Sequence, residues 1–254
     1  MSRSFELLSQ LGRMQEVLQK PERPSPGLAE EPLVESLIPT TTFAAQGNVR
    51  EEVIKLVRNL FFVPGADAPR HVVFAGTESG TGCSWICSHA AEVLASQAQG
   101  SVCLVDANLR APGLHQRFNA PNHHGLSDAL VGSGPIHQYL HRLSPSNLYF
   151  LSCGSVEEGR QALLATEAMR SRINELYSKF DYVLFDVASL STCNDGLVLG
   201  SAADGIVLVV RANASRRETA LKAVQELKAT NVEVLGAVLN QRTFPIPDAI
   251  YKYL

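Results

Sequence analysis

From residue 71 onward, short β-branched apolar runs alternate with longer amphipathic stretches along the chain. The apolar runs are HVVFAG, SVCLVDA, NLYFLSC, DYVLFDV, GIVLVVR and VEVLGAVLN, and helical stretches such as 84–98, 160–178 and 215–229 lie between them. Runs that are apolar at every position predict strands covered on both faces, and helical crossovers between such strands imply a parallel sheet. The pattern therefore predicts a doubly wound α/β domain, with a mainly parallel sheet and helices on both faces.

The N-terminal part of the chain has a different pattern. Leu7, Leu11, Met14 and Leu18 recur at helical spacing, which predicts an amphipathic helix over residues 1–19. Residues 20–46 are rich in proline, which removes backbone donors and disfavours helix, so they are expected to form a linker. Helical periodicity resumes in NVREEVIKLVRNLFF, and we expect one folded domain over residues 47–254.

Composition narrows the functional classes. The chain has 254 residues, 45% of them hydrophobic, and a formal net charge of -3, so it can bury a core but has no basic field for nucleic acid. It has no apolar run of about 18 residues and no signal-peptide pattern at its start. Its five cysteines are an odd number, which favours reduced thiols. These features predict a cytoplasmic protein.

The chemistry is expected at the carboxyl ends of the parallel strands, where such sheets bind ligands. The first strand is followed by GTESGTGCS, in which glycines let backbone amides converge on phosphate oxygens at a helix N-terminus. A lone glycine-rich turn between a strand and a helix is about as often a simple tight turn as a phosphate-binding loop. The predicted nucleotide-binding residues of this segment are Ser79, Gly80, Thr81, Gly82, Cys83, Ser84 and Trp85.

Two acidic residues follow neighbouring apolar runs. Asp106 ends SVCLVD and Asp186 ends DYVLFD, where carboxylates are placed to hold a magnesium ion and its waters opposite bound phosphates. Ser84 is the third predicted magnesium ligand. An aspartate at a strand end is about as often a helix cap, so each residue alone is a weak signal.

In this order the motifs resemble those of the bacterial tyrosine kinases of capsule and exopolysaccharide synthesis, a branch of the deviant Walker P-loop ATPases. The resemblance covers about residues 47–254: ESGTGCS corresponds to Walker A, CLVDANLRAPGLH to the second aspartate motif of these kinases, and YVLFD to Walker B. It implies ATP or ADP and Mg²⁺ as cofactors, with Asp106, Asp186 and Arg110 as catalytic candidates. It also implies nucleotide contacts from Asn240, which matches a residue that reads adenine, and Arg242.

The resemblance further implies partners. Glu52, Lys55 and Arg58 fill the motif that supports ring oligomers in the family, so a homo-oligomer is expected. Tyr251 and Tyr253 are the candidate phosphoacceptors, although two tyrosines at this spacing more often pack as part of an amphipathic last helix. The implied partner is a polysaccharide co-polymerase of the inner membrane, to which the chain would be peripheral, and no nucleic acid is expected.

Three departures from the family pattern meet at one site. Cys83 stands where the Walker A lysine is expected, Asn108 replaces the second acidic residue of the aspartate motif, and VASL replaces the Pro-Pro after Walker B. A lost charge-assisted bond lowers affinity about 10- to 100-fold, whereas a lost catalytic charge lowers phosphoryl transfer by about 10³-fold or more. We therefore expect a regulator or scaffold that binds nucleotide weakly or not at all. The alternatives are an active tyrosine autokinase that uses an arginine in place of the lysine and, less favoured, a partition-type ATPase.

Cys83 also raises a question of reactivity. A thiol at a helix N-terminus tends to have a lowered pKa, which predicts fast alkylation that bound nucleotide slows. A buried, inert small residue is the equally weighted alternative. Pairing of Cys83 with Cys87 in a metal site is disfavoured, as is a zinc site among the histidines after the aspartate motif, because neither set has metal-ligand spacing.

Overall fold

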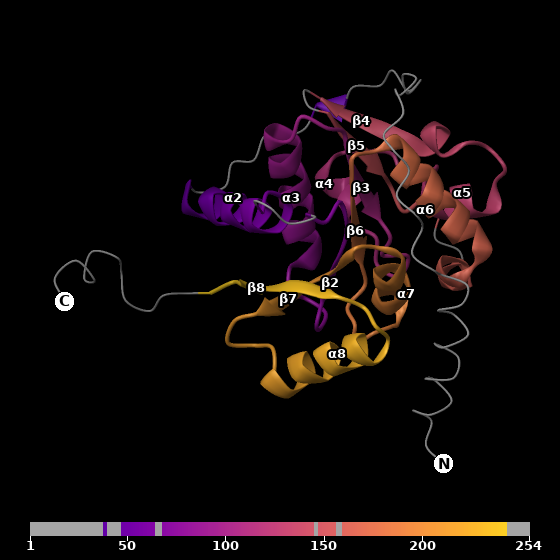
Figure 1. Cartoon of the computed structure of the whole chain (residues 1–254). Helices are drawn as coiled ribbons and strands as arrows, with labels where there is room; N and C mark the ends of the chain where they lie inside the picture. Colours follow the sequence, from indigo (N-terminus) through magenta and orange to yellow (C-terminus); the bar gives the residue numbers. More distant parts are fainter. Residues whose placement is uncertain (1–37, 40–46, 64–67, 145–146, 156–158, 243–254) are drawn as a thin grey trace, which may run out of the picture.

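The computed structural model describes residues 38–39, 47–63, 68–144, 147–155 and 159–242 (Figure 1). The predicted helix over 1–19 and the candidate phosphoacceptors Tyr251 and Tyr253 lie outside these residues, as does most of the predicted linker. None of the helices in the described ranges combines the length and the apolar character that a membrane span requires.

An eight-stranded sheet forms the centre of the fold, in the order β1-β4-β5-β3-β6-β2-β7-β8. All adjacent strands are parallel except β4 and β5, which are antiparallel. The strands are β1 (Ile38–Pro39), β2 (His71–Gly76), β3 (Val102–Asp106), β4 (Leu140–Ser144), β5 (Leu148–Leu151), β6 (Tyr182–Val187), β7 (Gly205–Arg211) and β8 (Val234–Asn240). The six strands predicted from apolar runs are all present, so the predicted α/β fold is confirmed.

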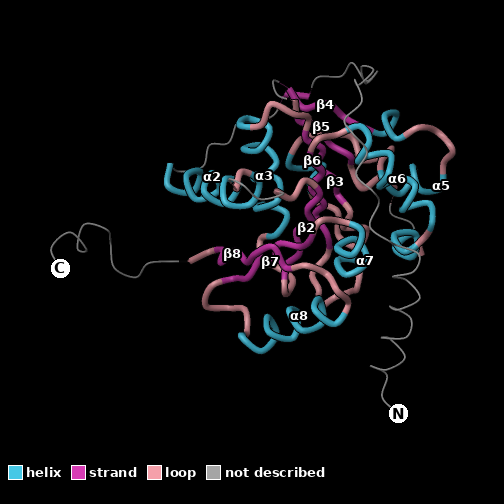
Figure 2. Tube along the Cα trace, in the orientation of Figure 1, coloured by secondary structure: helices cyan, strands magenta, loops and turns pink. Residues whose placement is uncertain are grey.

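Helices cover both faces of the sheet, as the two-sided apolar strands require (Figure 2). Along β2, Val72 and Phe74 belong to one buried cluster, whereas Val73 and Ala75 belong to the other. The first cluster is covered by α2 (Gly47–Phe61), α3 (Cys83–Gln97) and the short α4 (Leu114–Arg117). The second is covered by α5 (Leu126–Val131), α6 (Glu167–Lys179), α7 (Asp195–Ala202) and α8 (Arg217–Ala229).

Three details differ from the sequence pattern. The stretch 160–178 contains a 3₁₀ helix, η2 (Arg160–Ala165), followed by α6, and a second 3₁₀ helix, η1 (Ile136–Tyr139), precedes β4. β4 was not predicted, because its sequence LHRLS carries polar residues and no apolar run. Within the predicted linker, Ile38 and Pro39 form β1 and pair with β4.

The strand register brings the motifs to one edge of the sheet. Asp106 at the end of β3 lies opposite Asp186 in β6, and Asp186 lies opposite Phe74 in β2. The segment that follows β2 therefore leaves the sheet beside both carboxyl groups. This is the edge at which parallel α/β sheets bind ligands.

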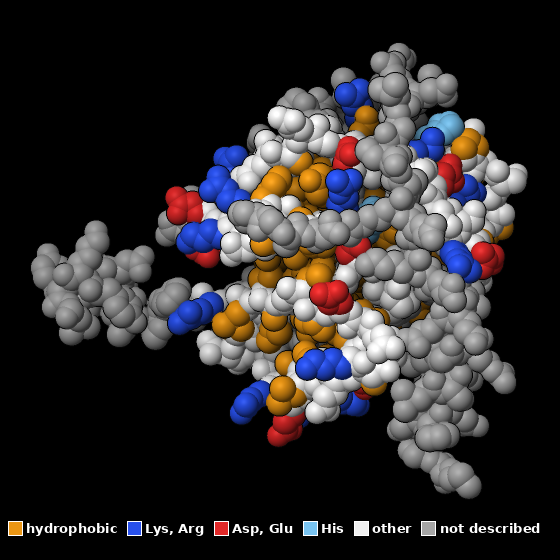
Figure 3. Space-filling view, in the orientation of Figure 1, with side chains coloured by type: hydrophobic (Ala, Val, Ile, Leu, Met, Phe, Trp, Pro, Cys, Tyr) orange, Lys and Arg blue, Asp and Glu red, His pale blue; other side chains and the backbone are white. Residues whose placement is uncertain are grey.

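Part of the surface is apolar. Figure 3 shows hydrophobic side chains gathered between α2 and α8, in the region of β8. The large apolar side chains that are exposed among the described residues are Val49, Phe62, Val63, Val131, Leu221 and Leu239.

Candidate functional site

The loop between β2 and α3 has the backbone of a phosphate-binding loop. Gly80 and Gly82 both have φ of 80°, a left-handed conformation that favours glycine. The Asn240 side chain at the end of β8 donates a hydrogen bond from Nδ2 to the Thr81 carbonyl at 2.8 Å, and a Cβ on Gly82 would collide with that nitrogen. The glycines are thus required by the loop conformation and by the close approach of Asn240.

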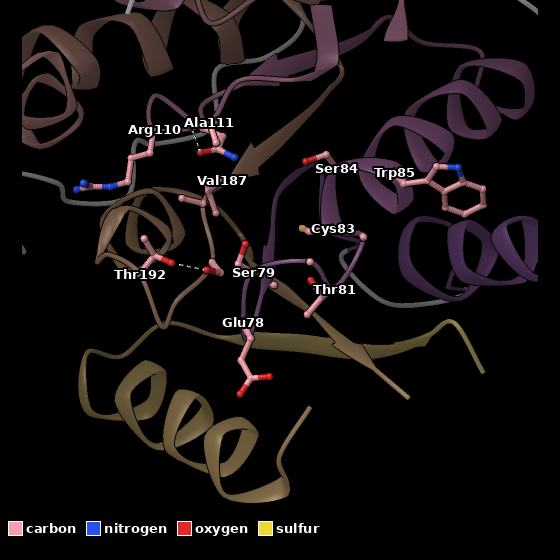
Figure 4. A pocket seen from close by; sticks show the side chains of 16 residues that line it. Glu78, Ser79, Thr81, Cys83, Ser84, Trp85, Arg110, Ala111, Val187 and Thr192 are labelled. Atoms are coloured by element: carbon pink, nitrogen blue, oxygen red, sulfur yellow. Dashed lines mark hydrogen bonds between the residues drawn. The ribbon is translucent and has the colours of Figure 1, made fainter. Parts of the chain in front are cut away.

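A pocket of about 450 Å³ opens beside this loop. All of the nucleotide-binding residues predicted from Ser79 to Trp85 line it, together with Arg110, whereas Asn240 and Arg242 are not among its lining residues (Figure 4). Asn240 instead contacts the loop from outside, and its base-reading role stays a prediction. The other lining residues are Gly76, Glu78, Asn108, Ala111, Val187, Ala188, Ser189 and Thr192.

Two hydroxyls on the wall after β6 were not predicted as site residues. Ser189 Oγ and Thr192 Oγ1 lie 2.7 Å apart and form a hydrogen bond. Ser189 belongs to the VASL segment that replaces the family's Pro-Pro, and Thr192 follows two residues after that segment, so the departure from the motif was the signal that marked this position. The wall offers hydroxyl groups rather than charge.

Asp106 is fully buried and its carboxylate is held by the main chain. Its Oδ1 accepts a bond from the Asn108 amide at 3.3 Å, and its Oδ2 accepts bonds from the Gly113 amide at 3.3 Å and the Leu114 amide at 3.1 Å. Burial raises its pKa to about 6, against the lowering effect of these amides. Asp106 therefore caps the start of α4, which is the structural alternative given above for an aspartate at a strand end.

Asp186 is equally buried but less satisfied. Its Oδ1 has no hydrogen-bond partner among the described residues. Burial, and then the charge of Asp106, raise its pKa to about 8, while hydrogen bonds with Ser84 and Cys83 oppose the rise. The shift favours the protonated form of this carboxyl group when no cation is near. Neither Asp106 nor Asp186 is among the residues that line the pocket, but Asp186 contacts Ser84 and Cys83, which do line it.

Cys83 begins α3 and faces inward. The residue is only 9% exposed, and its thiol is hydrogen-bonded to the Asp186 side chain and to the Gly76 backbone. Burial and the neighbouring Asp186 raise its pKa well above the ordinary value. The expected lowering of its pKa is therefore wrong, because loss of solvent and a buried acid outweigh the helix N-terminus. The alternative of a buried small residue is confirmed.

Arg110 is the one basic side chain among the described residues that line the pocket. Its Nε lies 3.6 Å from Asp195 Oδ2, and a hydrogen bond with Cys193 contributes most to the raised pKa of Arg110. Arg110 is therefore held toward the start of α7. Three other arginines, at the end of β7 and the start of α8, are exposed and do not line the pocket: Arg211, Arg216 and Arg217.

Neither metal alternative gains support. Within the described ranges, no three side chains of the metal-binding types cluster closely enough to hold an ion. The rings of Trp85 and His89 lie with centroids 3.8 Å apart and their planes tilted by 38°, and the ring of His89 hydrogen-bonds Arg117 at 2.7 Å. In Figure 4 the Trp85 indole is directed away from Ser79.

The predicted oligomerisation residues lie on the outer face of α2. Glu52, Lys55 and Arg58 are exposed, and Lys55 Nζ lies 2.6 Å from Glu52 Oε1. The opposite face of α2 packs through Val53 and Val57 into the cluster that contains α3. The three side chains are therefore accessible, and their role in assembly stays a prediction.

The site fits a magnesium nucleotide in part. The loop backbone, the Ser84 hydroxyl and the orphaned Asp186 oxygen are groups that such a ligand uses. The lysine that contacts the β and γ phosphates in P-loop proteins has no counterpart, since Cys83 is neutral and buried. Within the part of the chain that the structure describes, the arrangement keeps the phosphate cradle but has no fixed cation at the lysine position.

Comparisons with known proteins agree with the fold and motifs, although no family model matches. The chain is 28% identical over 194 residues to the tyrosine-protein kinase YwqD of Bacillus subtilis, a match that covers 76% of this chain and 81% of YwqD. It is 31% identical over 169 residues to the putative tyrosine-protein kinase EpsB of Ralstonia nicotianae, covering 66% of this chain and 22% of EpsB. The chain thus spans most of one relative but less than a quarter of the other.

Solved structures show the same fold. The chimerical protein CapA2B2 aligns with a TM-score of 0.73 and 22% identity, over 82% of this chain and 95% of that one. The kinase domain of Escherichia coli ETK aligns with a TM-score of 0.70 and 23% identity, over 78% and 79%. The septum site-determining protein MinD of Pyrococcus horikoshii, complexed with Mg-ADP, has a TM-score of 0.58 and 21% identity, over 72% and 76%. The resemblance seen in the sequence is confirmed: the chain is a relative of the bacterial tyrosine kinases and has their P-loop NTPase fold.

Proposed function

We propose that this chain is a kinase-like regulator or scaffold of exopolysaccharide or capsule synthesis that has lost phosphoryl transfer. In this proposal it binds ATP or ADP with Mg²⁺ weakly or not at all and acts through a polysaccharide co-polymerase of the inner membrane. The observation that carries the proposal is the place of Cys83, whose neutral thiol is buried against Asp186 where the family has a lysine.

The binding half of the proposal rests on what the loop retains. Backbone amides at the start of α3 and the glycine conformations at Gly80 and Gly82 need no lysine to form a phosphate cradle. Ser84 and Asp186 supply oxygen ligands for Mg²⁺, which would draw the proton from the Asp186 carboxyl group. The missing lysine lowers affinity by roughly 10- to 100-fold.

The loss of transfer rests on what the pocket lacks. Phosphoryl transfer depends on fixed positive charge around the transferred group, and loss of one such charge lowers the rate by about 10³-fold or more. Cys83 supplies no charge, and Arg110 is engaged by Asp195 and Cys193. Chemistry therefore fails before binding does.

An active tyrosine autokinase is the second candidate, and Arg110 is the observation that favours it. Arg110 lines the pocket, and its side chain is 42% exposed, so it is free to exchange partners at low cost. In that mechanism Arg110 moves from Asp195 onto the phosphates, and Tyr251 or Tyr253 of the same or a neighbouring copy accepts the phosphoryl group.

Labelling with radioactive ATP separates the two candidates. The natural protein is expected to incorporate no phosphate, and the Cys83→Lys variant is expected to gain incorporation at Tyr251 or Tyr253. The matched Cys83→Ala variant removes the thiol without adding charge and should stay inactive. If the natural protein incorporates phosphate at a rate that Cys83→Lys does not exceed, the regulator proposal is wrong.

Assembly is a separate part of the proposal. The exposed Glu52, Lys55 and Arg58 on α2 are the residues expected to join copies into an oligomer. Mass measurement in solution, with and without Mg-ADP, should show an oligomer that a Glu52→Lys, Arg58→Glu double variant disrupts. If the natural protein is monomeric both with and without Mg-ADP, the proposal that it forms an oligomer is wrong.

A further inference from the structure

The polar groups of the pocket fall into two sets with different charges. On one side stand the main-chain amides around Gly80 to Ser84 at the start of α3. On the other stand the hydroxyls of Ser189 and Thr192 and the carboxamide of Asn108. The first set is suited to phosphate because the amides converge and the helix dipole adds positive potential. The second set is neutral.

The two sets differ in what they offer to the phosphates of a nucleotide. In P-loop proteins the loop amides cradle the α and β phosphates, whereas the lysine reaches the β and γ phosphates. The loop is present here and the lysine is not. Cys83, at the lysine position, lines the pocket with a neutral thiol that is hydrogen-bonded to the Asp186 side chain and the Gly76 backbone. The loss therefore falls most heavily on the γ phosphate.

The remaining charged side chains do not replace the lysine. Arg110 and Glu78 are the charged residues among the described pocket lining. Arg110 is paired with Asp195, and Figure 4 shows its side chain extending away from Ser84. In the same view Glu78 extends toward α8. A γ phosphate would thus meet neutral hydroxyls above two buried carboxyl groups.

We infer that this pocket selects nucleoside diphosphates over nucleoside triphosphates, the reverse of what a kinase site requires. The inference rests on the proposed function, since it assumes that a nucleotide occupies the pocket. The β phosphate keeps the loop amides and Ser84, but the γ phosphate loses water without gaining a positively charged side chain. Loss of the charge-assisted bond to the γ phosphate corresponds to a preference of about tenfold or more for the diphosphate.

A preference for the diphosphate would let the pocket regulate the scaffold in response to ADP. A scaffold whose pocket prefers a diphosphate reports the level of ADP even when ATP is present. The nucleotide would then act as a ligand that stabilises the loop, Asn240 and the end of β8 in one arrangement. No covalent step is needed for such a signal.

Calorimetry with Mg-ADP, Mg-ATP and Mg-AMP tests the inference on the full chain. The natural protein should bind Mg-ADP about tenfold or more tightly than Mg-ATP, and Mg-AMP should bind more weakly than Mg-ADP because the loop amides then lack a β phosphate. Equal affinities for Mg-ADP and Mg-ATP would overturn the inference, as would equal affinities for Mg-ADP and Mg-AMP. Absence of binding by all three nucleotides would also overturn it.

Two variants identify the cause. Cys83→Lys restores a cation and should narrow or reverse the diphosphate preference, whereas Cys83→Ser keeps a small neutral group and should retain the preference. If Cys83→Lys leaves the ratio of the two affinities unchanged, the missing cation is not its origin and the inference fails. Thermal unfolding of both variants shows whether they fold, and if Cys83→Lys does not, the affinity ratio for the natural protein decides.

Arg110→Ala tests the remaining cation. The ratio of Mg-ADP to Mg-ATP affinity should change by less than about threefold, because the paired Arg110 does not reach the γ phosphate. A larger fall in Mg-ATP affinity alone would show that Arg110 contacts that phosphate, and would overturn the inference of a cation-free γ position. This result is distinct from failure of the proposed function, which depends on phosphate incorporation and not on the affinity ratio.

Discussion

Asp106 and Asp186 lie opposite each other in neighbouring strands and are both almost fully buried, but their surroundings differ. Three backbone amides from the segment that leads into α4 point at the Asp106 carboxylate. The Asp186 carboxyl group contacts two side chains, those of Cys83 and Ser84, and keeps one oxygen without a partner among the described residues. Both carboxylate oxygens of Asp106 accept hydrogen bonds within the fold, whereas one oxygen of Asp186 accepts none from the described residues.

The difference separates a carboxylate that stabilises the fold from one that keeps an oxygen without a partner among the described residues. A carboxylate held by amides stabilises a loop whether or not a ligand is present. An oxygen buried without a partner carries a free-energy cost that a cation or a donor group can remove. Asp186 is thus the residue of the pair with unused capacity for Mg²⁺, and Asp106 contributes mainly through its negative charge and its hold on α4.

The largest effect should come from removing the satisfied carboxylate. Asp106→Ala leaves three amides without their acceptor and is expected to lower the free energy of unfolding by roughly 2–4 kcal/mol. Urea unfolding measures the change. Asp106→Asn keeps one acceptor oxygen and should lose less, so an equal loss in both variants, or a loss below about 0.5 kcal/mol in Asp106→Ala, would contradict the capping role.

Asp186→Asn should have the opposite effect at alkaline pH. The carboxyl pKa rises from an unfolded value of about 3.9 to about 8 in the folded chain, so the folded state holds a proton that the unfolded state has released between these pH values. The contribution of Asp186 to stability is therefore complete below about pH 4 and is lost as the pH rises toward 8. Asn does not titrate, so the variant should lose less stability over this range and exceed the natural protein by roughly 1–2 kcal/mol at pH 8.

Thermal unfolding at pH 5 and pH 8 measures this difference. The loss of stability between pH 5 and pH 8 should be smaller in Asp186→Asn than in the natural protein. Asp106 also has a raised pKa, so part of the slope will remain in the variant. Parallel slopes for the two proteins would show that Asp186 ionises freely in the folded chain.

The positions of both residues followed from the sequence, but their different roles did not. Apolar runs located the strands, and parallel strands place the residues that follow them at one edge, so Asp106 and Asp186 were expected to meet. Which of them has its oxygens hydrogen-bonded depends on the path of residues 107–114, which brings two amides to Asp106 Oδ2. Turns have no regular periodicity, so the sequence carries little signal of such a path. The short polar strand β4 escaped prediction for a similar reason, because it has no apolar run.

Cys83 shows a second limit of reasoning from local position. Its place at the start of α3 was predicted correctly, and a helix N-terminus lowers a thiol pKa when the thiol faces solvent. The thiol is buried instead and touches Asp186, so burial first and the neighbouring Asp186 second raise its pKa. Burial depends on how the helix is rotated against the sheet, which the local motif does not specify.

Thiol labelling sharpens this point. Cys193 is partly exposed beside Arg110, whereas the other four cysteines are buried, including Cys83. In the native protein, alkylation of Cys193 should be about tenfold or more faster than alkylation of Cys83, and urea should equalise the two rates. Mass spectrometry of peptides after brief iodoacetamide treatment measures both. Faster labelling of Cys83 would show a thiol that faces solvent, in contrast to its contact with Asp186.

The smallest effect concerns the tether that holds the loop above both carboxyl groups. Asn240 Nδ2 donates to the Thr81 carbonyl at 2.8 Å, from the end of β8 across to the loop after β2. Asn240→Ala should lower the free energy of unfolding by only about 1 kcal/mol, since one neutral hydrogen bond is lost at a half-exposed position. Its local effect should be larger, because the left-handed Gly82 packs against the same amide. Hydrogen exchange at residues 80–84 should therefore quicken in this variant while the amides of β3 and β6 remain protected. Asn240→Leu is the matched control, since it retains bulk against Gly82 but cannot donate, and if it exchanges as slowly as the natural protein, packing rather than the hydrogen bond holds the loop.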